Sequence, residues 1–279
     1  MSQIEFNTKR DALLDQIRSL GSCAVAFSGG VDSAVVAQAA QLALDEDAVA
    51  VTGVSHSLAP GELNVARDVA RQIGIRHVEV ETEEFGNPDY VQNDARRCFH
   101  CKTELYTHLT SFCQLNSIAC ILNGANVDDQ DDYRPGMEAA RNFQVISPLA
   151  ECGLNKTEVR QLAAQWNLPV WDKPASPCLS SRVAYGEEVT PERLRMIDEA
   201  ECFLREQGLR EVRVRYHRGD LARIEMPVDS IYAFLDPQRR ASIADFLRSL
   251  GFRFVTIDLE GFRSGSLNSL VSIDQIKRL

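Results

Sequence analysis

Short apolar runs alternate with amphipathic segments along most of the chain, and this alternation is the feature that most constrains its fold. The apolar runs at 23–27, 48–55, 77–82 and 119–126 are predicted strands. Predicted helices follow them at 34–44, 61–74, 101–116 and 156–169. Strands and helices in this order form a parallel sheet with helices on both faces. We therefore predict an α/β fold with a doubly wound parallel sheet.

The pattern changes after residue 186, where we predict a second, smaller domain. Its predicted elements are a helix at 191–207, strands at 211–217 and 221–226, a helix at 237–250 and a strand at 252–259. The short RGD turn between the first two strands predicts an antiparallel pair. We therefore expect a parallel-sheet domain at 1–186 and an α+β domain at 187–279.

One face of the predicted strand at 211–217 is basic. Because side chains alternate along a strand, Arg213, Arg215 and His217 share that face. Such a face is either solvated or turned toward a ligand, and the two alternatives are about equally supported by the sequence.

Composition limits the partners of the chain. Its net charge of −10 over 279 residues disfavours nucleic acid, because broad contact with a phosphate backbone requires positive charge. The polar, amphipathic start of the chain predicts no secretory signal, and the apolar runs are too short to span a bilayer. We therefore expect a cytoplasmic protein with no membrane partner.

The stretch AVAFSGGVDSAVV, residues 24–36, predicts a phosphate-binding loop between a strand and a helix. Gly29 and Gly30 let the backbone pass close to a ligand, while helix amides and the hydroxyls of Ser28 and Ser33 would bind phosphate. Asp32 would repel a bare polyphosphate, so Mg²⁺ is expected between them. The loop lacks the lysine of the Walker pattern G-x-x-x-x-G-K-[ST], and a plain glycine turn is the alternative.

A second loop is predicted beside the first. The stretch ILNGANVDDQDDYRPG, residues 121–136, brings Gly124 and Asn126 to the carboxyl edge of the sheet, where neighbouring strands end. Its acidic residues either hold a metal or form a solvated loop; they are Asp128, Asp129, Asp131 and Asp132.

The cysteines are not arranged as a disulfide framework. The chain has eight cysteines and no predicted export signal. Cys23, Cys120 and Cys202 lie in apolar patterns and are predicted to be small hydrophobes. Cys98 and Cys101 form a C-x-x-C pair, which can be half a zinc site, a redox couple, part of an iron–sulfur ligand set or a coincidence.

The sequence SGGVDS resembles the S-G-G-x-D-S signature of the PP-loop ATP pyrophosphatases, whose fold is of the adenine nucleotide alpha hydrolase type. Enzymes of that superfamily grip the β,γ-pyrophosphate of ATP, transfer AMP to a substrate oxygen and release pyrophosphate. The resemblance implies ATP and Mg²⁺ as cofactors. The expected nucleotide-binding residues are Ser28, Gly29, Gly30, Asp32, Ser33 and Gly124.

Later motifs carry a finer resemblance. From about residue 8 to 270 the chain resembles the LarE family of sulfur transferases in nickel-pincer nucleotide biosynthesis. The motifs that carry this resemblance are, in order, DYRPG, NKTEVRQLA, KPASPCLSSR, VRVRYH, ARIE and GFRSG. The resemblance implies that ATP adenylates a carboxylate of pyridinium-3,5-biscarboxylate mononucleotide, and that sulfur then displaces AMP to give a thiocarboxylate. Cys178, in PCLSSR, matches the family's sulfur-handling cysteine. Arg134, Arg182, Arg215 and Glu225 are the expected substrate-binding residues.

The resemblance also bears on the C-x-x-C pair. One branch of the LarE family has the single cysteine and gives up its sulfur, whereas another also carries a C-x-x-C pair. Cys98, Cys101 and Cys178 match the second branch, in which three thiolates hold a [4Fe–4S] cluster and leave one iron free to bind sulfide. The resemblance further implies a sulfide or another sulfur donor, and a homo-oligomer.

Three other functions are open. A tRNA thiolase is disfavoured by the negative net charge. An ammonia-dependent ligase of the same superfamily would have no use for Cys178. A nucleotide-binding module without catalysis, with a zinc site at the C-x-x-C pair, would lack pyrophosphate exchange.

Overall fold

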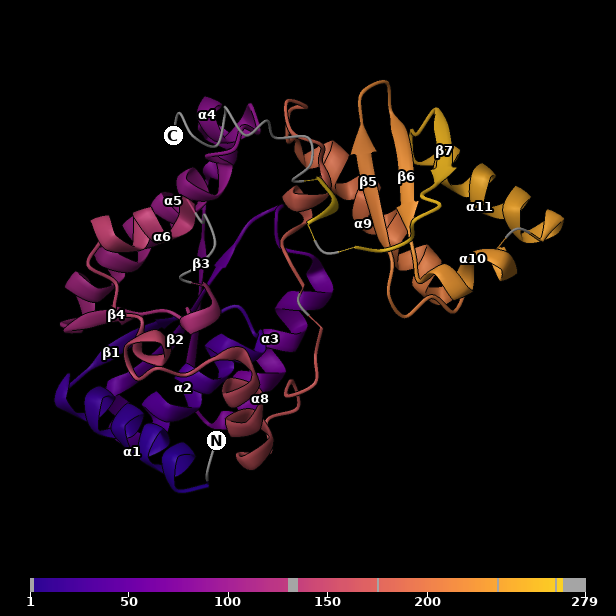
Figure 1. Ribbon diagram of the computed structural model, residues 1–279. Helices are drawn as coiled ribbons and strands as arrows, with labels where there is room; N and C mark the ends of the chain where they lie inside the picture. Colours follow the sequence, from indigo (N-terminus) through magenta and orange to yellow (C-terminus); the bar gives the residue numbers. More distant parts are fainter. Residues whose placement is uncertain (1–2, 130–134, 175, 235, 264, 268–279) are drawn as a thin grey trace. The chain divides into compact units, whose positions relative to one another are not determined.

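The computed structural model describes residues 3–129, 135–174, 176–234, 236–263 and 265–267 (Figure 1). The chain forms two compact units. The first unit comprises Met1–Glu84 and Cys98–Ser176, and the second comprises Phe85–Arg97 and Pro177–Leu279. The domain boundary placed after residue 186 stays a prediction.

The first unit is built on a parallel sheet, as the alternation predicts. Its strands are β1 (Cys23–Ala26), β2 (Ala48–Val54), β3 (Arg76–Glu81) and β4 (Cys120–Leu122). The strand order is β3-β2-β1-β4, and each neighbouring pair is parallel. β1 is therefore an inner strand, with β2 on one side and β4 on the other.

Helices cover both faces of this sheet (Figure 1). One face carries α1 (Gln3–Ser19), α2 (Val31–Leu44), α3 (Pro60–Ile73) and α8 (Lys156–Gln165), and the other carries α5 (Arg97–Asn116) and α6 (Pro135–Asn142). Side chains alternate along β1, so that Cys23 and Val25 pack against the helices of the first face and Ala24 packs against those of the second face. The predicted doubly wound α/β fold is confirmed.

Local residues explain where several elements end. α3 ends at Gly74, whose φ of 80° is the left-handed conformation typical of a helix C-cap. α8 begins with a capping box between Asn155 and Glu158, and it ends at Gln165 because Asn167 adopts a φ of 55°. β4 is shorter than the predicted strand 119–126, because Asn123 starts a turn in which its side chain accepts a hydrogen bond from the Ala125 amide.

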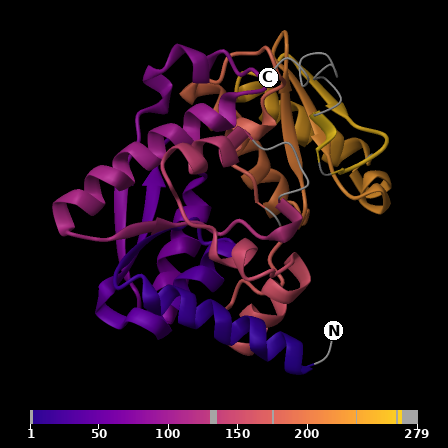
Figure 2. The same ribbon diagram turned by 60° about the vertical axis from the view of Figure 1, so that its left-hand side comes forward.

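The second unit, whose C-terminal part is orange to yellow in Figure 2, holds a smaller sheet in the order β5-β6-β7 (Figure 1). β5 (Arg213–His217) and β6 (Leu221–Glu225) are antiparallel, as predicted, while β7 (Phe254–Ile257) runs parallel to β6. The longer helices described in this unit are α9 (Pro191–Glu206), α10 (Val228–Phe234) and α11 (Pro237–Ser249). The short helical elements of the chain are η1 (Asp45–Asp47), η2 (Glu84–Gly86), α4 (Pro88–Val91), η3 (Val127–Asp129), α7 (Pro148–Glu151) and η4 (Leu179–Arg182).

Polar contacts attach Phe85–Arg97 to the C-terminal part of the chain. The Tyr90 hydroxyl lies 2.7 Å from the Ser180 hydroxyl, and Arg97 Nη1 donates to the Ser180 carbonyl over 2.9 Å. The Asn93 amide donates to the Ala184 carbonyl over 2.9 Å. These contacts explain why a segment from the middle of the first domain's sequence belongs to the second unit. No helix in the described ranges is long and apolar enough to cross a membrane.

Candidate active site

The predicted phosphate-binding loop joins β1 to α2 at the carboxyl edge of the parallel sheet (Figure 1). Because β1 has β2 on one side and β4 on the other, the ends of β1 and β4 flank a topological switch point, where ligands of such sheets bind. Gly30 is the N-cap of α2, and among the described residues no side chain caps the helix there. The first amides of α2 can therefore serve an anion.

Hydrogen bonds within the loop fix its shape. The Ser33 hydroxyl donates to the Gly30 carbonyl over 3.1 Å and accepts from the Ser28 amide over 3.2 Å. The Ser28 hydroxyl lies 3.2 Å from that of Ser33 and accepts from the Gly30 amide at 3.4 Å. The two hydroxyls thus sit together at the N-terminus of α2, where the sequence predicts phosphate.

Two glycines are sterically required at this edge. A Cβ atom on Gly29 would lie 2.8 Å from the Cα of Ala66 in α3, and its φ of 68° disfavours any other residue. A Cβ atom on Gly124 would lie 2.7 Å from the amide nitrogen of Ser33. The loop after β4 therefore packs directly against the first turn of α2.

Asp32 makes an ion pair that sequence reasoning missed. Its Oδ2 lies 2.5 Å from Nζ of Lys156, and its Oδ1 accepts a hydrogen bond from Nδ2 of Asn126 over 3.2 Å. Lys156 is the first residue of α8, where its positive charge opposes the helix dipole. That unfavourable placement is the sequence signal that could have revealed a function for Lys156. The pair brings a cation to the side of the phosphate loop.

The acidic loop after β4 is only partly described. The Asp128 carboxylate accepts from the Lys156 amide over 2.9 Å, and that of Asp129 accepts from the Asn126 amide over 3.0 Å. Asp131, Asp132 and the predicted substrate residue Arg134 lie outside the described residues. Where the structure describes the chain, no group of three or more His, Cys, Asp or Glu residues is arranged to hold a metal ion.

In the second unit, Cys178 is anchored through its backbone and keeps an exposed side chain. It is the N-cap of η4, and its carbonyl accepts from Arg182 Nη1 over 2.9 Å. Arg182 is buried, and its Nε lies 3.1 Å from the Glu201 carboxylate, which is fully buried. Arg182 therefore contacts the backbone at Cys178.

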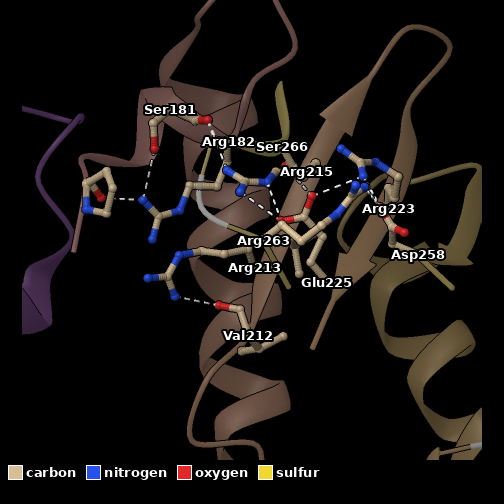
Figure 3. Close-up of polar contacts among 12 residues, drawn as sticks. Ser181, Arg182, Val212, Arg213, Arg215, Arg223, Glu225, Asp258, Arg263 and Ser266 are labelled. Atoms are coloured by element: carbon tan, nitrogen blue, oxygen red, sulfur yellow. Dashed lines mark hydrogen bonds and ion pairs between the residues drawn. The ribbon is translucent and has the colours of Figure 1, made fainter. Parts of the chain in front are cut away.

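Arg215 and Glu225 form the centre of a buried polar cluster (Figure 3). Arg215 Nε and Nη2 lie 2.9 and 2.8 Å from Glu225 Oε2, and Arg215 Nη1 donates to the Ser181 carbonyl over 3.2 Å. Glu225 Oε1 is also 3.0 Å from Arg223 and accepts from the Ser266 hydroxyl over 2.5 Å. Three of the predicted site residues, Arg182, Arg215 and Glu225, thus lie around the turn that carries Cys178.

Burial decides between the two alternatives for the basic strand face. Arg213 and Arg215 are only 8% and 7% exposed, so the solvated face is wrong. Burial, together with the charge of Arg182, lowers the pKa of Arg213, whose guanidinium stacks over the Phe262 ring at 5.3 Å. The guanidinium of Arg213 therefore lies in a buried setting, and such a group is suited to bind a phosphate or a carboxylate.

His217 gives this cluster a pH dependence. Its Nε2 accepts a hydrogen bond from Arg223 Nε over 3.0 Å, and burial and the charge of Arg223 lower its pKa below 6.5. The unfolded chain therefore binds this proton at higher pH than the folded chain does, so stability falls as pH drops below about 6.5. We expect the free energy of unfolding, measured in urea, to fall less between pH 7.5 and pH 5.5 in His217→Gln than in the wild type. An equal loss in both proteins would contradict this assignment.

The cysteines fall into two groups. Burial raises the pKa of Cys23 to about 12 and that of Cys113 to about 11, so both are poor nucleophiles. Cys98 and Cys101 lie in the first turn of α5, spaced so that both are on the same helix face, and Cys98 is exposed. Cys202 is also exposed, so it does not pack in the core as the small hydrophobe that its apolar pattern predicted. It lies on the outer side of α9, where Arg205 donates to its sulfur.

Comparison with known proteins identifies the class. Residues 9–93, which include the phosphate loop, match the asparagine synthase family. Over 271 residues the chain is 36% identical to pyridinium-3,5-bisthiocarboxylic acid mononucleotide synthase of Lactiplantibacillus plantarum, covering 96% of this chain and 97% of that protein. It is 43% identical over 265 residues to an uncharacterized protein of Synechocystis sp., covering 95% and 98%, and 26% identical over 242 residues to one of Methanocaldococcus jannaschii, covering 86% and 90%.

The loop at the switch point of a parallel sheet, together with the asparagine synthase match, defines a PP-loop enzyme that uses ATP. Within this class the chain belongs to the LarE family, and it is an ATP-dependent enzyme that transfers sulfur. The resemblance that the motifs carry is confirmed.

Proposed function

We propose that this enzyme converts a carboxylate of pyridinium-3,5-biscarboxylate mononucleotide to a thiocarboxylate at the expense of ATP. The observation that carries the proposal is the exposed Cys178 thiol, held at its backbone by Arg182 beside a buried arginine–glutamate cluster. A thiol near cationic groups suits sulfur chemistry on an anionic nucleotide. The relative from L. plantarum is named for the corresponding bisthiocarboxylic product.

In the first step, a carboxylate oxygen of the substrate attacks the α-phosphorus of ATP, and the bond to pyrophosphate breaks. The amides of α2 and the hydroxyls of Ser28 and Ser33 bind the departing pyrophosphate. Lys156 offsets the negative charge of Asp32 beside it. If Mg²⁺ accompanies the ATP, Asp32 and Asp128 would supply oxygen ligands of the kind it prefers, and one or two carboxylates would suffice because the ion keeps water and phosphate oxygens as ligands.

In the second step, a sulfur nucleophile attacks the carbonyl carbon of the acyl adenylate, and AMP leaves with the electron pair of the broken C–O bond. An acyl adenylate is a mixed anhydride, so a thiolate displaces AMP at neutral pH. We assign to Cys178 the holding of the group that would carry an external sulfide, so that sulfide forms the new C–S bond, the C–O bond to AMP breaks, and the Cβ–S bond of Cys178 stays intact. The anchored η4 turn orients its backbone while the side chain stays accessible.

We propose that the thiols of Cys98, Cys101 and Cys178 would hold a [4Fe–4S] cluster. Iron–sulfur clusters require accessible thiolates, and these are free cysteines outside the buried group. Arg97, the residue before Cys98, donates to the carbonyl of Ser180, two residues after Cys178. When bound by three thiolates, such a cluster supplies an iron able to carry the sulfide to be transferred.

Arg215 and Glu225 are proposed to recognise the substrate, with Arg215 nearest its phosphate. Because Arg215→Ala leaves the buried Glu225 with fewer partners, we expect it to destabilise the protein by about 3 kcal/mol and to weaken substrate binding far more than ATP binding. The double variant Arg215→Met with Glu225→Met should recover stability without recovering substrate affinity. Isothermal titration and chemical unfolding measure the two effects. Equal losses of substrate and ATP affinity in the single variant would contradict this role.

The rest of the proposal concerns the setting of the reaction. We propose an external sulfide or other sulfur donor, a homo-oligomer, and the cytoplasm as the compartment, because a reducing compartment keeps the thiols available. The function is tested by ATP–pyrophosphate exchange that depends on the pyridinium biscarboxylate. Exchange that needs tRNA, or no exchange at all, would contradict it.

A further inference from the structure

The segment that precedes Cys178 lies along α3 of the first unit. At one end Gln72 donates to the Asn167 carbonyl over 2.8 Å. At the other end Lys173 Nζ lies 2.6 Å from Glu62 Oε2, and the Ser176 hydroxyl donates to Glu62 Oε1 over 3.0 Å. We call residues 167–174 together with Ser176 the strap. It runs from the C-terminal part of α3 to its first turn.

The strap is held by more than one surface contact. Arg160 of α8 donates to the carbonyls of Trp171 and Lys173 over 2.7 and 2.8 Å. The side chains of Lys173 and Glu62 are only 21% and 26% exposed, so water screens their ion pair less than it screens a fully exposed pair. The Glu62 carboxylate therefore holds Lys173 and Ser176, which lie just before Cys178 in the sequence.

The same face of α3 also supports the phosphate loop. Glu62 and Ala66 are four residues apart and share a helix face. Ala66 lies so close to Gly29 that a Cβ atom there would be 2.8 Å from the Ala66 Cα. One face of one helix thus contacts both the ATP loop and the strap.

We propose that Glu62 is a positioning residue for the sulfur step. It clasps the strap through Lys173 and Ser176, while Ala66 keeps α3 against the phosphate loop. Two residues span at most about 7 Å, so a fixed Ser176 limits where Cys178 can travel. The clasp thereby limits the range over which the chain that continues from Ser176 can carry the Cys178 thiol. This inference rests on the proposed function and adds a residue to it.

The test separates the two half-reactions. For Glu62→Ala we expect substrate-dependent ATP–pyrophosphate exchange within about twofold of the wild type, because the phosphate loop is untouched. Thiocarboxylate formation should fall by about 10- to 100-fold, since misplacement by about 1 Å has that effect on a positioned reaction. Lys173→Met should show the same split, and Glu62→Gln, which can still accept from Ser176, should lose less. A change of both half-reactions by the same factor, or of neither, overturns the proposal.

The matched control is Glu79→Gln in β3, which removes an ion pair of 2.7 Å to Arg67 of the same helix α3. It should leave both half-reactions unchanged, and a loss of thiocarboxylate formation equal to that of Glu62→Ala would overturn the proposal. Hydrogen exchange gives a readout independent of sulfur transfer: peptides from the strap should exchange faster in Glu62→Ala, and those from the phosphate loop should not. Unchanged hydrogen exchange in the strap would show that Glu62 does not hold the strap. If the wild-type enzyme forms no thiocarboxylate, the proposed function is wrong. The hydrogen-exchange rates of the strap would still test whether Glu62 holds it.

Discussion

Replacing Asp32 by alanine is expected to lower pyrophosphate exchange by at least about 10³-fold while the protein stays folded. Asp32 lies in the first turn of α2, where its carboxylate is held between Lys156 and Asn126. Its loss removes the proposed metal ligand and leaves Lys156 without its counter-charge at the developing pyrophosphate. The effect is of the size found when a group that stabilises transition-state charge is deleted. Exchange at the wild-type rate would show that the phosphate-loop assignment is wrong.

A charge-deletion series refines this test. Lys156→Met should lower exchange by about 10²-fold, again because a group beside the developing charge is lost. In the double variant the two losses should not add, since the residues act as one pair. Arg18→Met is the matched control, because it removes an exposed ion pair of 2.5 Å to Asp15 within α1. It should leave the exchange rate as it was.

Replacing Cys178 by alanine is expected to abolish thiocarboxylate formation and to spare ATP–pyrophosphate exchange. The thiol acts only after the adenylate has formed, so the first step does not need it. If the cluster is bound as proposed, Cys98→Ala and Cys101→Ala should abolish catalytic sulfur transfer too, and all three variants should lose iron and visible absorbance under anaerobic preparation.

Cys202→Ala is the control, because Cys202 is another exposed thiol of the second unit. It should keep iron, absorbance and activity. If only Cys178→Ala matters, and the spent protein lacks the mass of one H₂S, the enzyme sacrifices its own sulfur and the cluster proposal is wrong.

The sequence predicted well what depends on local pattern. Alternation of strands and helices fixed the parallel sheet, and the order SGGVDS fixed a glycine loop at the start of a helix, because such signals involve residues close together in the chain. The RGD turn gave the antiparallel pair of β5 and β6 for the same reason.

What the sequence did not predict depends on residues far apart. Lys156 pairs with Asp32, which lies 124 positions away in the sequence, and no local pattern indicates this contact. Alternation correctly placed Arg213 and Arg215 on one face of β5, but the burial of that face depends on Glu225 in β6 and on the ring of Phe262. Residue patterns show which side chains share a face, whereas the partners that cover the face come from the tertiary fold.

Cys202 is a residue whose exposure the local sequence did not predict. Apolar neighbours in the sequence predicted a small hydrophobe, yet α9 turns this residue outward. The grouping of Phe85–Arg97 with the C-terminal part of the chain is a further case, since Asn93 and Arg97 find their partners in the η4 turn and the residues after it.

The central claim is that ATP is spent to exchange a carboxylate oxygen for sulfur. Its most direct test is mass spectrometry of the products from purified enzyme, ATP, Mg²⁺, sulfide and pyridinium-3,5-biscarboxylate mononucleotide without oxygen. The account predicts AMP, pyrophosphate and a nucleotide in which sulfur replaces one oxygen, with one AMP formed for each thiocarboxylate. AMP formed without a sulfur-containing nucleotide, or an amide formed when ammonia replaces sulfide, would contradict it.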